Sequence, residues 1–179
     1  MSEELEIFVH QLTPHPRHSF NDQFVAFDKS RVPERYSKSN IWHNYILMES
    51  LPNNEVSNLA VEIIETSRTH IGLGIGSSAI FEKVDTKKSS QNVFYDLSAR
   101  NININRAVLK THFKFYKGSC VRLEVNLSSK TIIFFTKNSA ESEEKFIATV
   151  DIPHHLSKKD LFFFISLQDC GDQVRLLQP

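Results

Sequence analysis

Apolar and polar residues alternate between positions 121 and 127. The apolar side chains are Val121, Leu123, Val125 and Leu127, and the residues between them are Arg122, Glu124 and Asn126. A period of two predicts a strand with one apolar face and one face in water. Residues 131–136 are β-branched or aromatic, so they predict a second strand that pairs back on the first. In that strand, either Phe134 or Phe135 is expected to point into the core.

Further strands are predicted where short apolar or β-branched runs lie between turn residues. These runs are residues 24–27, 42–47, 59–65, 70–75, 161–167 and 173–177. Short strands at such intervals indicate an antiparallel sandwich. Helix signals are scarce. A single helical turn is expected at 153–160, because Pro153 suits a first helical position.

The order of these strands resembles the SPRY domain over roughly residues 59–177. A Gly-containing turn leads into the strand at 120–127, and the next strand ends in Phe134-Phe-Thr-Lys-Asn138. Upstream, residues 70–75 read His-Ile-Gly-Leu-Gly-Ile, similar to a strand of that family. The chain departs from the family at 93–100, which stand in place of a Trp-rich and Gly-Asp-rich stretch. The resemblance implies an all-β fold, an antiparallel β-sandwich of the concanavalin-like jelly-roll type.

Length and local pattern predict one domain and one extension. Residues 1–20 show neither a strand nor a helix period and are interpreted as an N-terminal arm. Residues 21–179 are interpreted as a single SPRY-like β-sandwich domain, because a chain of this length can bury a core of its own.

Charge and hydropathy exclude several partners. The chain has 21 basic and 21 acidic residues, so it lacks the positive field that nucleic-acid binding needs. No apolar run reaches the roughly 18 residues of a membrane span. The sequence also shows no secretory signal, so we expect the cytoplasm or nucleus, with Cys120 and Cys170 as free thiols.

The motifs of common enzymes are absent or misspaced. Gly72, Gly74 and Gly76 do not have the spacing of a dinucleotide loop and are interpreted as sites where a strand packs closely. The histidines lack zinc-ligand spacing, and no Gly-x-Ser-x-Gly elbow occurs. We therefore predict no enzyme, no catalytic residue, no metal and no small-molecule cofactor.

Aromatic and arginine side chains near predicted loops are the candidates for binding, because these residue types dominate protein interfaces. The candidate residues are Arg35, Tyr36, Tyr95 and Arg100. In SPRY domains variable loops at one edge of the sandwich present the ligand surface. The predicted function is a non-catalytic protein-interaction module that recognises a protein or short peptide in this way. Two alternatives remain: a structural subunit of a larger assembly, and a carbohydrate-binding β-sandwich, for which Asn101, Asn103 and Asn105 are the candidates.

Overall fold

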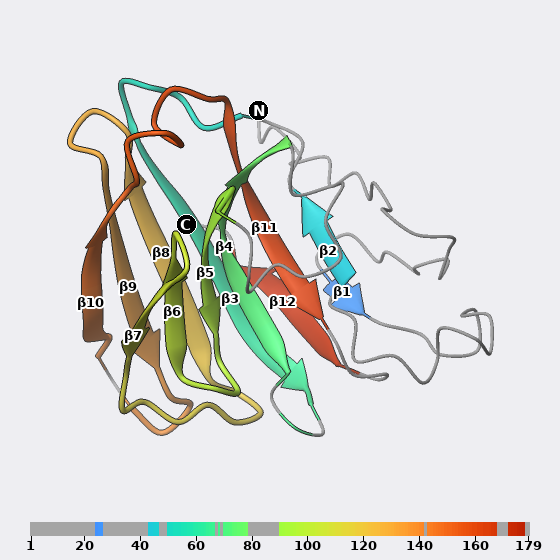
Figure 1. Ribbon diagram of the computed structural model, residues 1–179. Coiled ribbons are helices and arrows are strands. Elements are labelled where there is room, and N and C mark those ends of the chain that lie inside the picture. The colour runs from blue at the N-terminus through green and yellow to red at the C-terminus, as the bar shows by residue number, and fades with distance from the viewer. Residues whose placement is uncertain are drawn as a thin grey trace.

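The chain forms a two-layered β-sandwich. Its structure, a computed structural model, describes residues 24–26, 43–46, 50–66, 68, 70–78, 90–141, 143–167 and 172–177. The strands in chain order are β1 (Phe24–Ala26), β2 (His43–Ile46), β3 (Val56–Glu65), β4 (Ile71–Ser77), β5 (Asn92–Asp96), β6 (Asn101–Ile104), β7 (Ala107–Lys110), β8 (Cys120–Asn126), β9 (Thr131–Lys137), β10 (Lys145–Asp151), β11 (Leu161–Leu167) and β12 (Gln173–Leu177) (Figure 1).

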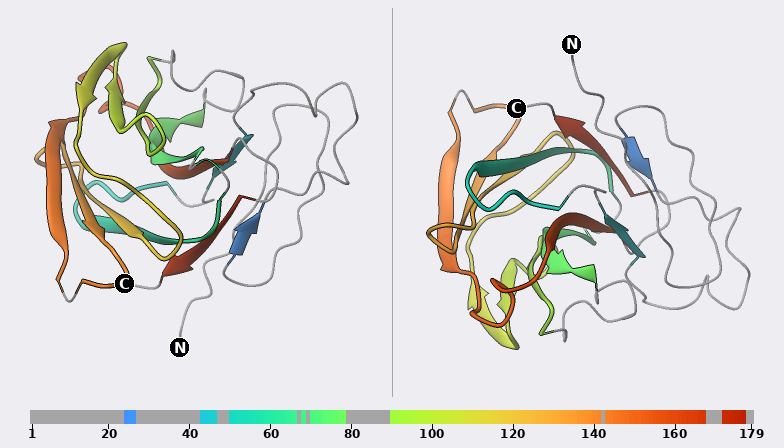
Figure 2. Two further views of the ribbon diagram at one scale, coloured as in Figure 1. Left: turned by 90° about the horizontal axis from the view of Figure 1, so that it is seen from below. Right: turned by 90° about the horizontal axis from the view of Figure 1, so that it is seen from above.

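The strands of the described residues form two sheets of six. Sheet A has the order β1-β12-β3-β8-β9-β10, and sheet B has the order β2-β11-β4-β5-β6-β7. Every pairing between neighbouring strands is antiparallel. The two sheets lie face to face when the molecule is viewed along the strands (Figure 2). The predicted antiparallel β-sandwich is confirmed.

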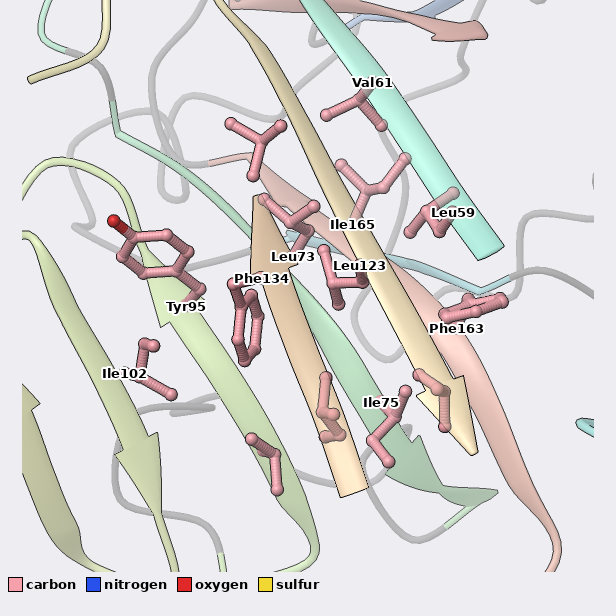
Figure 3. Close-up of a cluster of buried hydrophobic side chains, with 14 of the residues drawn as sticks. Leu59, Val61, Leu73, Ile75, Tyr95, Ile102, Leu123, Phe134, Phe163 and Ile165 are labelled. Atoms are coloured by element: carbon pink, nitrogen blue, oxygen red, sulfur yellow. The ribbon is translucent and has the colours of Figure 1, made fainter. Parts of the chain in front are cut away.

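The core lies between the sheets, and the alternation at 121–127 is one of its sources. Val121, Leu123 and Val125 are buried, while the residues between them are only half-buried. In β9, Phe134 pairs with Leu123 and is completely buried, whereas Phe135 faces the other side of the sheet. Figure 3 shows Phe134 within this cluster, beside Tyr95 of the opposite sheet. The predicted inward Phe is therefore Phe134.

Two glycines of β4 allow close packing, as predicted. A Cβ atom on Gly74 would lie 1.9 Å from the carbonyl oxygen of Val93, which belongs to the neighbouring strand. A Cβ atom on Gly72 would lie 2.1 Å from the ring of Phe94. Only residues without a side chain fit at these two positions.

The stretch at 93–96 belongs to a strand, β5, although Tyr95 is predicted to lie near a loop. All five residues of β5 are buried. Val93 and Tyr95 belong to the core between the sheets, and Phe94 stacks on Phe164 with ring centres 5.8 Å apart. Both faces of the strand are covered, so it has no alternation of apolar and polar residues.

Other predictions differ in detail or lie outside the described residues. Residues 154–158 form turns, and the Ser157 N–H donates to the Pro153 carbonyl at 3.1 Å, which is the bond of one helical turn that does not continue. The hairpin of β6 and β7 was not predicted. Its turn residues Asn105 and Arg106 have φ values of 46° and 70°, a conformation usually marked by glycine. The predicted N-terminal arm, residues 1–20, lies outside the described part of the chain.

Candidate binding surface at one end of the sandwich

Two segments meet at one end of the sandwich, and we call them together the loop end. The first is the turn at residues 97–100, between β5 and β6. The second is residues 111–119, which lead from β7 of sheet B to β8 of sheet A. This crossing runs along the lower edge of the molecule in Figure 1. The loop end therefore bridges the two sheets.

The turn at 97–100 is held by one carboxylate. Asp96 Oδ1 accepts hydrogen bonds from the backbone N–H groups of Ser98 and Ala99, each at 3.1 Å, and from the Ser98 hydroxyl at 2.7 Å. Such an Asx turn replaces the backbone bonds that a tight turn lacks. Arg100, which ends the turn, has a φ of 57° and is exposed.

Thr111 joins the two segments of the loop end. Its backbone N–H donates to the Arg100 carbonyl at 2.8 Å, and its hydroxyl donates to the same oxygen at 3.0 Å. Because the threonine proton is used there, the Tyr95 hydroxyl is the donor in its 2.9 Å bond to Thr111 Oγ1. Tyr95 and Arg100 are thus brought together through a third residue.

Tyr95 itself is not a loop residue, and its predicted exposure is wrong. Its ring is completely buried in β5 and makes edge contacts with Phe115 and Phe134, at centroid distances of 5.6 and 5.4 Å. Burial raises the pKa of Tyr95 to about 12, although the bond to Thr111 acts in the opposite direction. The Tyr95 ring packs under Phe115 within the core and therefore stabilises the loop end, and it cannot contact a partner.

The segment at 111–119 presents side chains that are not among the binding residues predicted from the sequence. Phe115 is buried, while Lys114, Tyr116 and Lys117 are exposed, Tyr116 to 58%. A sequence pattern indicates this arrangement. The polar residues His112 and Lys114 alternate with two phenylalanines before a glycine turn, which is typical of an extended segment with one buried and one exposed side.

Hydrogen bonds fix the second half of this segment to sheet A. The Gly118 N–H donates to the Ile63 carbonyl at 2.7 Å, and the Tyr116 N–H donates to Ser119 Oγ at 2.9 Å. Ser119 Oγ in turn donates to Asn138 Oδ1 at 2.8 Å. The backbone on both sides of the Tyr116 side chain is therefore anchored.

The loop end carries positive charge. Lys117 pairs with Glu65 at 2.8 Å, and this hydrogen bond lowers the pKa of the Glu65 carboxyl. Arg100 and Lys114 form no ion pair with any residue that the structure describes. Both remain able to bind an acidic group.

A second group of charged and aromatic side chains lies on the outer face of sheet A. The Arg122 guanidinium lies 4.1 Å from the ring centre of Phe135 and binds both carboxylate oxygens of Glu144. It also donates to Asn58 Oδ1 at 2.9 Å. The Arg122 donors are used within the protein, so this group stabilises the sheet surface and is the weaker candidate for binding.

Arg35 and Tyr36, the other two predicted binding residues, lie outside the described residues. Within the described ranges, no three side chains of His, Cys, Asp or Glu come together in a way that could hold a metal ion. No helix in that same part of the chain is long and apolar enough to cross a membrane. Cys120 is a free thiol, and burial raises its pKa.

Solved structures identify the fold. The PSpry domain of TRIM65 superimposes with a TM-score of 0.67 at 14% identity, over 94% of this chain and 89% of that chain. A human SPRY domain gives a TM-score of 0.59 at 18% identity, over 78% of this chain and 86% of that chain. The SPRY domain of human HERC1 gives 0.61 at 14% identity, over 78% of this chain and 84% of that chain. The chain has the SPRY fold.

The SPRY-like architecture predicted from the strand order is thereby confirmed. Stonustoxin has the same fold over 76% of this chain, at 13% identity and a TM-score of 0.59, but the chain spans only 21% of the stonustoxin chain. No protein-family model and no curated protein matches the sequence. Because the identities are low, these comparisons establish the SPRY fold and leave the function to be argued from the surface.

Proposed function

We propose that this SPRY-fold chain is a non-catalytic protein-interaction module that recognises a protein or short peptide at the loop end. The observation that carries the proposal is Tyr116, whose side chain is 58% exposed on a backbone anchored on both sides. A preformed surface loses little conformational entropy on binding. Tyrosine supplies large contact area and a polar tip, which makes it a frequent anchor of protein interfaces.

The charges around Tyr116 favour a partner segment with acidic groups. Lys114 and Arg100 are exposed and have no ion pair among the described residues. An arginine can bind a carboxylate through two parallel hydrogen bonds. Arg35 and Tyr36 remain predicted contributors. We place the module in the cytoplasm or nucleus, where cysteines are kept reduced.

The alternative functions receive less support from the described residues. A carbohydrate site would need free amide groups, but the Asn103 side chain is buried and donates to the Phe94 carbonyl at 3.4 Å. A structural subunit would need a large apolar face. The exposed large apolar residues that the structure describes are spread over several strands and loops: Val56, Val108, Leu109, Tyr116 and Phe146.

The proposal is tested by replacing Tyr116 and Arg100 with alanine and measuring capture of partners from the native cell by affinity purification and mass spectrometry. Val56→Ala is the matched control, because Val56 is 49% exposed and begins β3 at the opposite end. We expect the partners retained by wild type and Val56→Ala to be lost from the double variant. Each anchor is worth about 2 kcal/mol, or roughly 30-fold in affinity.

Thermal unfolding of the three proteins controls for folding. Exposed substitutions usually change stability by only about 0.5 kcal/mol, so the melting temperatures should agree closely. If the double variant retains the same partners with the same affinity, the loop end is not the recognition surface. The structural-subunit alternative then becomes the preferred function.

A further inference from the structure

Strand β7 is the last strand of sheet B, and no described strand pairs with its outer edge. It pairs with β6 across the turn at Asn105 and Arg106, and the sheet order ends there. All four of its residues are exposed, and Val108 and Leu109 are exposed to 52% and 41%. An exposed edge strand with apolar side chains is a template for pairing with another chain.

The register shows which backbone groups face outward. The Thr111 N–H donates to the Arg100 carbonyl, so this pair is a hydrogen-bonded pair. Bonded and non-bonded pairs alternate in an antiparallel ladder. Leu109 and Ala107 therefore bond to β6, while the N–H and C=O groups of Val108 and Lys110 point away from it. No described group forms a hydrogen bond with these outward groups.

The edge of sheet A at β10 is irregular, whereas the β7 edge is regular. The pairing of β10 with β9 contains a register shift between Phe146 and Ala148. Bulges of this kind interfere with strand addition. The register of β7 against β6 runs without any shift.

The charged residues of the β6–β7 hairpin and of the chain on either side of it are of one sign. Between Asp96 and Glu124 the sequence contains arginines and lysines but no acidic residue. Arg106, at the start of the strand, and Lys110, at its end, form no ion pair with any described residue. In a protein with equal numbers of basic and acidic residues, this is a local positive field.

We propose that β7 binds an extended acidic segment of a partner protein, which adds to sheet B as a further strand. The outward backbone groups of Val108 and Lys110 would bond the segment, as in other cases of β-strand addition. Apolar side chains of the segment would pack beside Val108 and Leu109, and its carboxylates would reach Arg106 and Lys110. This surface is separate from Tyr116 and goes beyond the function proposed above.

Other occupants fit less well. A second copy of this chain would bring two hairpins that carry only basic charged residues edge to edge, and in the register centred on Val108 it would place Lys110 opposite Arg106 of the other copy, an unfavourable pair of like charges. A nucleic-acid backbone carries acceptors but would leave the outward carbonyl groups of β7 without donors. An acidic peptide satisfies both the backbone groups and the charges.

The test is amide hydrogen exchange, measured residue by residue by nuclear magnetic resonance. The probe is a synthetic peptide of alternating glutamate and valine with blocked ends, and the matched control peptide contains lysine in place of glutamate. With the acidic peptide at about ten times its Kd, exchange at Val108 and Lys110 should slow by about tenfold. Exchange at Thr149 of β10, the edge strand of sheet A, should not change. The lysine peptide should slow exchange in neither β7 nor β10.

Two variants separate strand addition from other binding. Val108→Pro removes an outward N–H that β6 does not use, so the hairpin is retained while peptide protection at Lys110 is lost. Arg106→Glu combined with Lys110→Glu should transfer the preference to the lysine peptide. Tyr116→Ala should leave this protection unchanged, so the result is independent of the test of the loop end.

Three outcomes would overturn the proposal. The first is acidic-peptide binding without slower exchange at Val108 and Lys110. The second is protection of these amides in the free protein that rises with protein concentration, which would assign the edge to a second copy. The third is binding of a single-stranded deoxyoligonucleotide that competes with the peptide and is equally strong in Val108→Pro, which would indicate a general polyanion surface.

Discussion

The Tyr95 hydroxyl lies 2.9 Å from Thr111 Oγ1, although the two residues are 16 positions apart in the sequence. This contact joins a buried strand to the segment that carries Tyr116. Because the Thr111 hydroxyl also binds the Arg100 carbonyl, one tyrosine sets the position of both halves of the loop end. The contact has a measurable consequence for stability.

The first prediction concerns pH. The pKa of Tyr95 is about 12, compared with an ordinary value of 10.0, because burial disfavours the phenolate. Above pH 10 the unfolded chain loses this proton before the folded chain does. The free energy of unfolding should therefore fall between pH 10 and 12, by at most about 1.4 kcal/mol per pH unit.

Urea unfolding of wild type and Tyr95→Phe checks this assignment. At pH 7 the variant should lose about 1 kcal/mol, because one hydrogen bond is removed. The difference between the two proteins should then shrink as pH rises from 10 to 12, since only wild type carries this titrating group. Parallel pH profiles for the two proteins would contradict the assignment.

The second prediction compares neighbouring phenylalanines. Phe134 is completely buried, so Phe134→Ala should reduce the free energy of unfolding by about 3 to 5 kcal/mol. Phe135→Ala is the matched control, because Phe135 lies on the outer face, where it contacts Arg122 and Phe146. Its loss should be about 1 kcal/mol. Equal losses in urea unfolding would mean that the inward and outward faces of β9 are assigned wrongly.

The third prediction compares two glycines. Gly74→Ala places a Cβ atom against the backbone of Val93, which cannot move without separating β4 from β5, so we expect a loss of about 3 kcal/mol or more. At Gly118 the nearest atoms belong to the Ser139 side chain at 3.2 Å, and the φ of 83° is the main cost. Gly118→Ala should lose about 1 kcal/mol. Melting temperatures that rank the variants in the opposite order would show that backbone conformation outweighs strand contact here.

The sequence predicted the sandwich because its central hairpin is covered on one face only. Val121, Leu123 and Val125 alternate with polar residues, and such a pattern defines both the strand and its buried side. Strand β5 was missed for the opposite reason. Its residues are buried on both faces, so apolar and polar residues do not alternate along it. Without that alternation, Tyr95 is interpreted from the sequence as a binding residue near a loop.

The candidate site could be predicted only in part. Arg100 lies in an exposed turn, as its predicted place near a loop implied, and its role in binding stays a prediction. The exposure of Tyr116 depends on the crossing from β7 to β8, which is a tertiary feature. The open edge of β7 depends on the order of strands in sheet B, which local sequence does not determine.

The order of strands in sheet A has a consequence for synthesis of the chain. Strand β3 lies between β8 and β12, and β1 pairs with β12. A ribosome delivers β12 last among the described strands, so one edge of β3 stays uncovered while the preceding strands emerge. Non-local pairing of this kind slows folding. Sheet A can therefore be completed only after residues 173–177 have been synthesised, and chaperones can bind the uncovered edge of β3 until then.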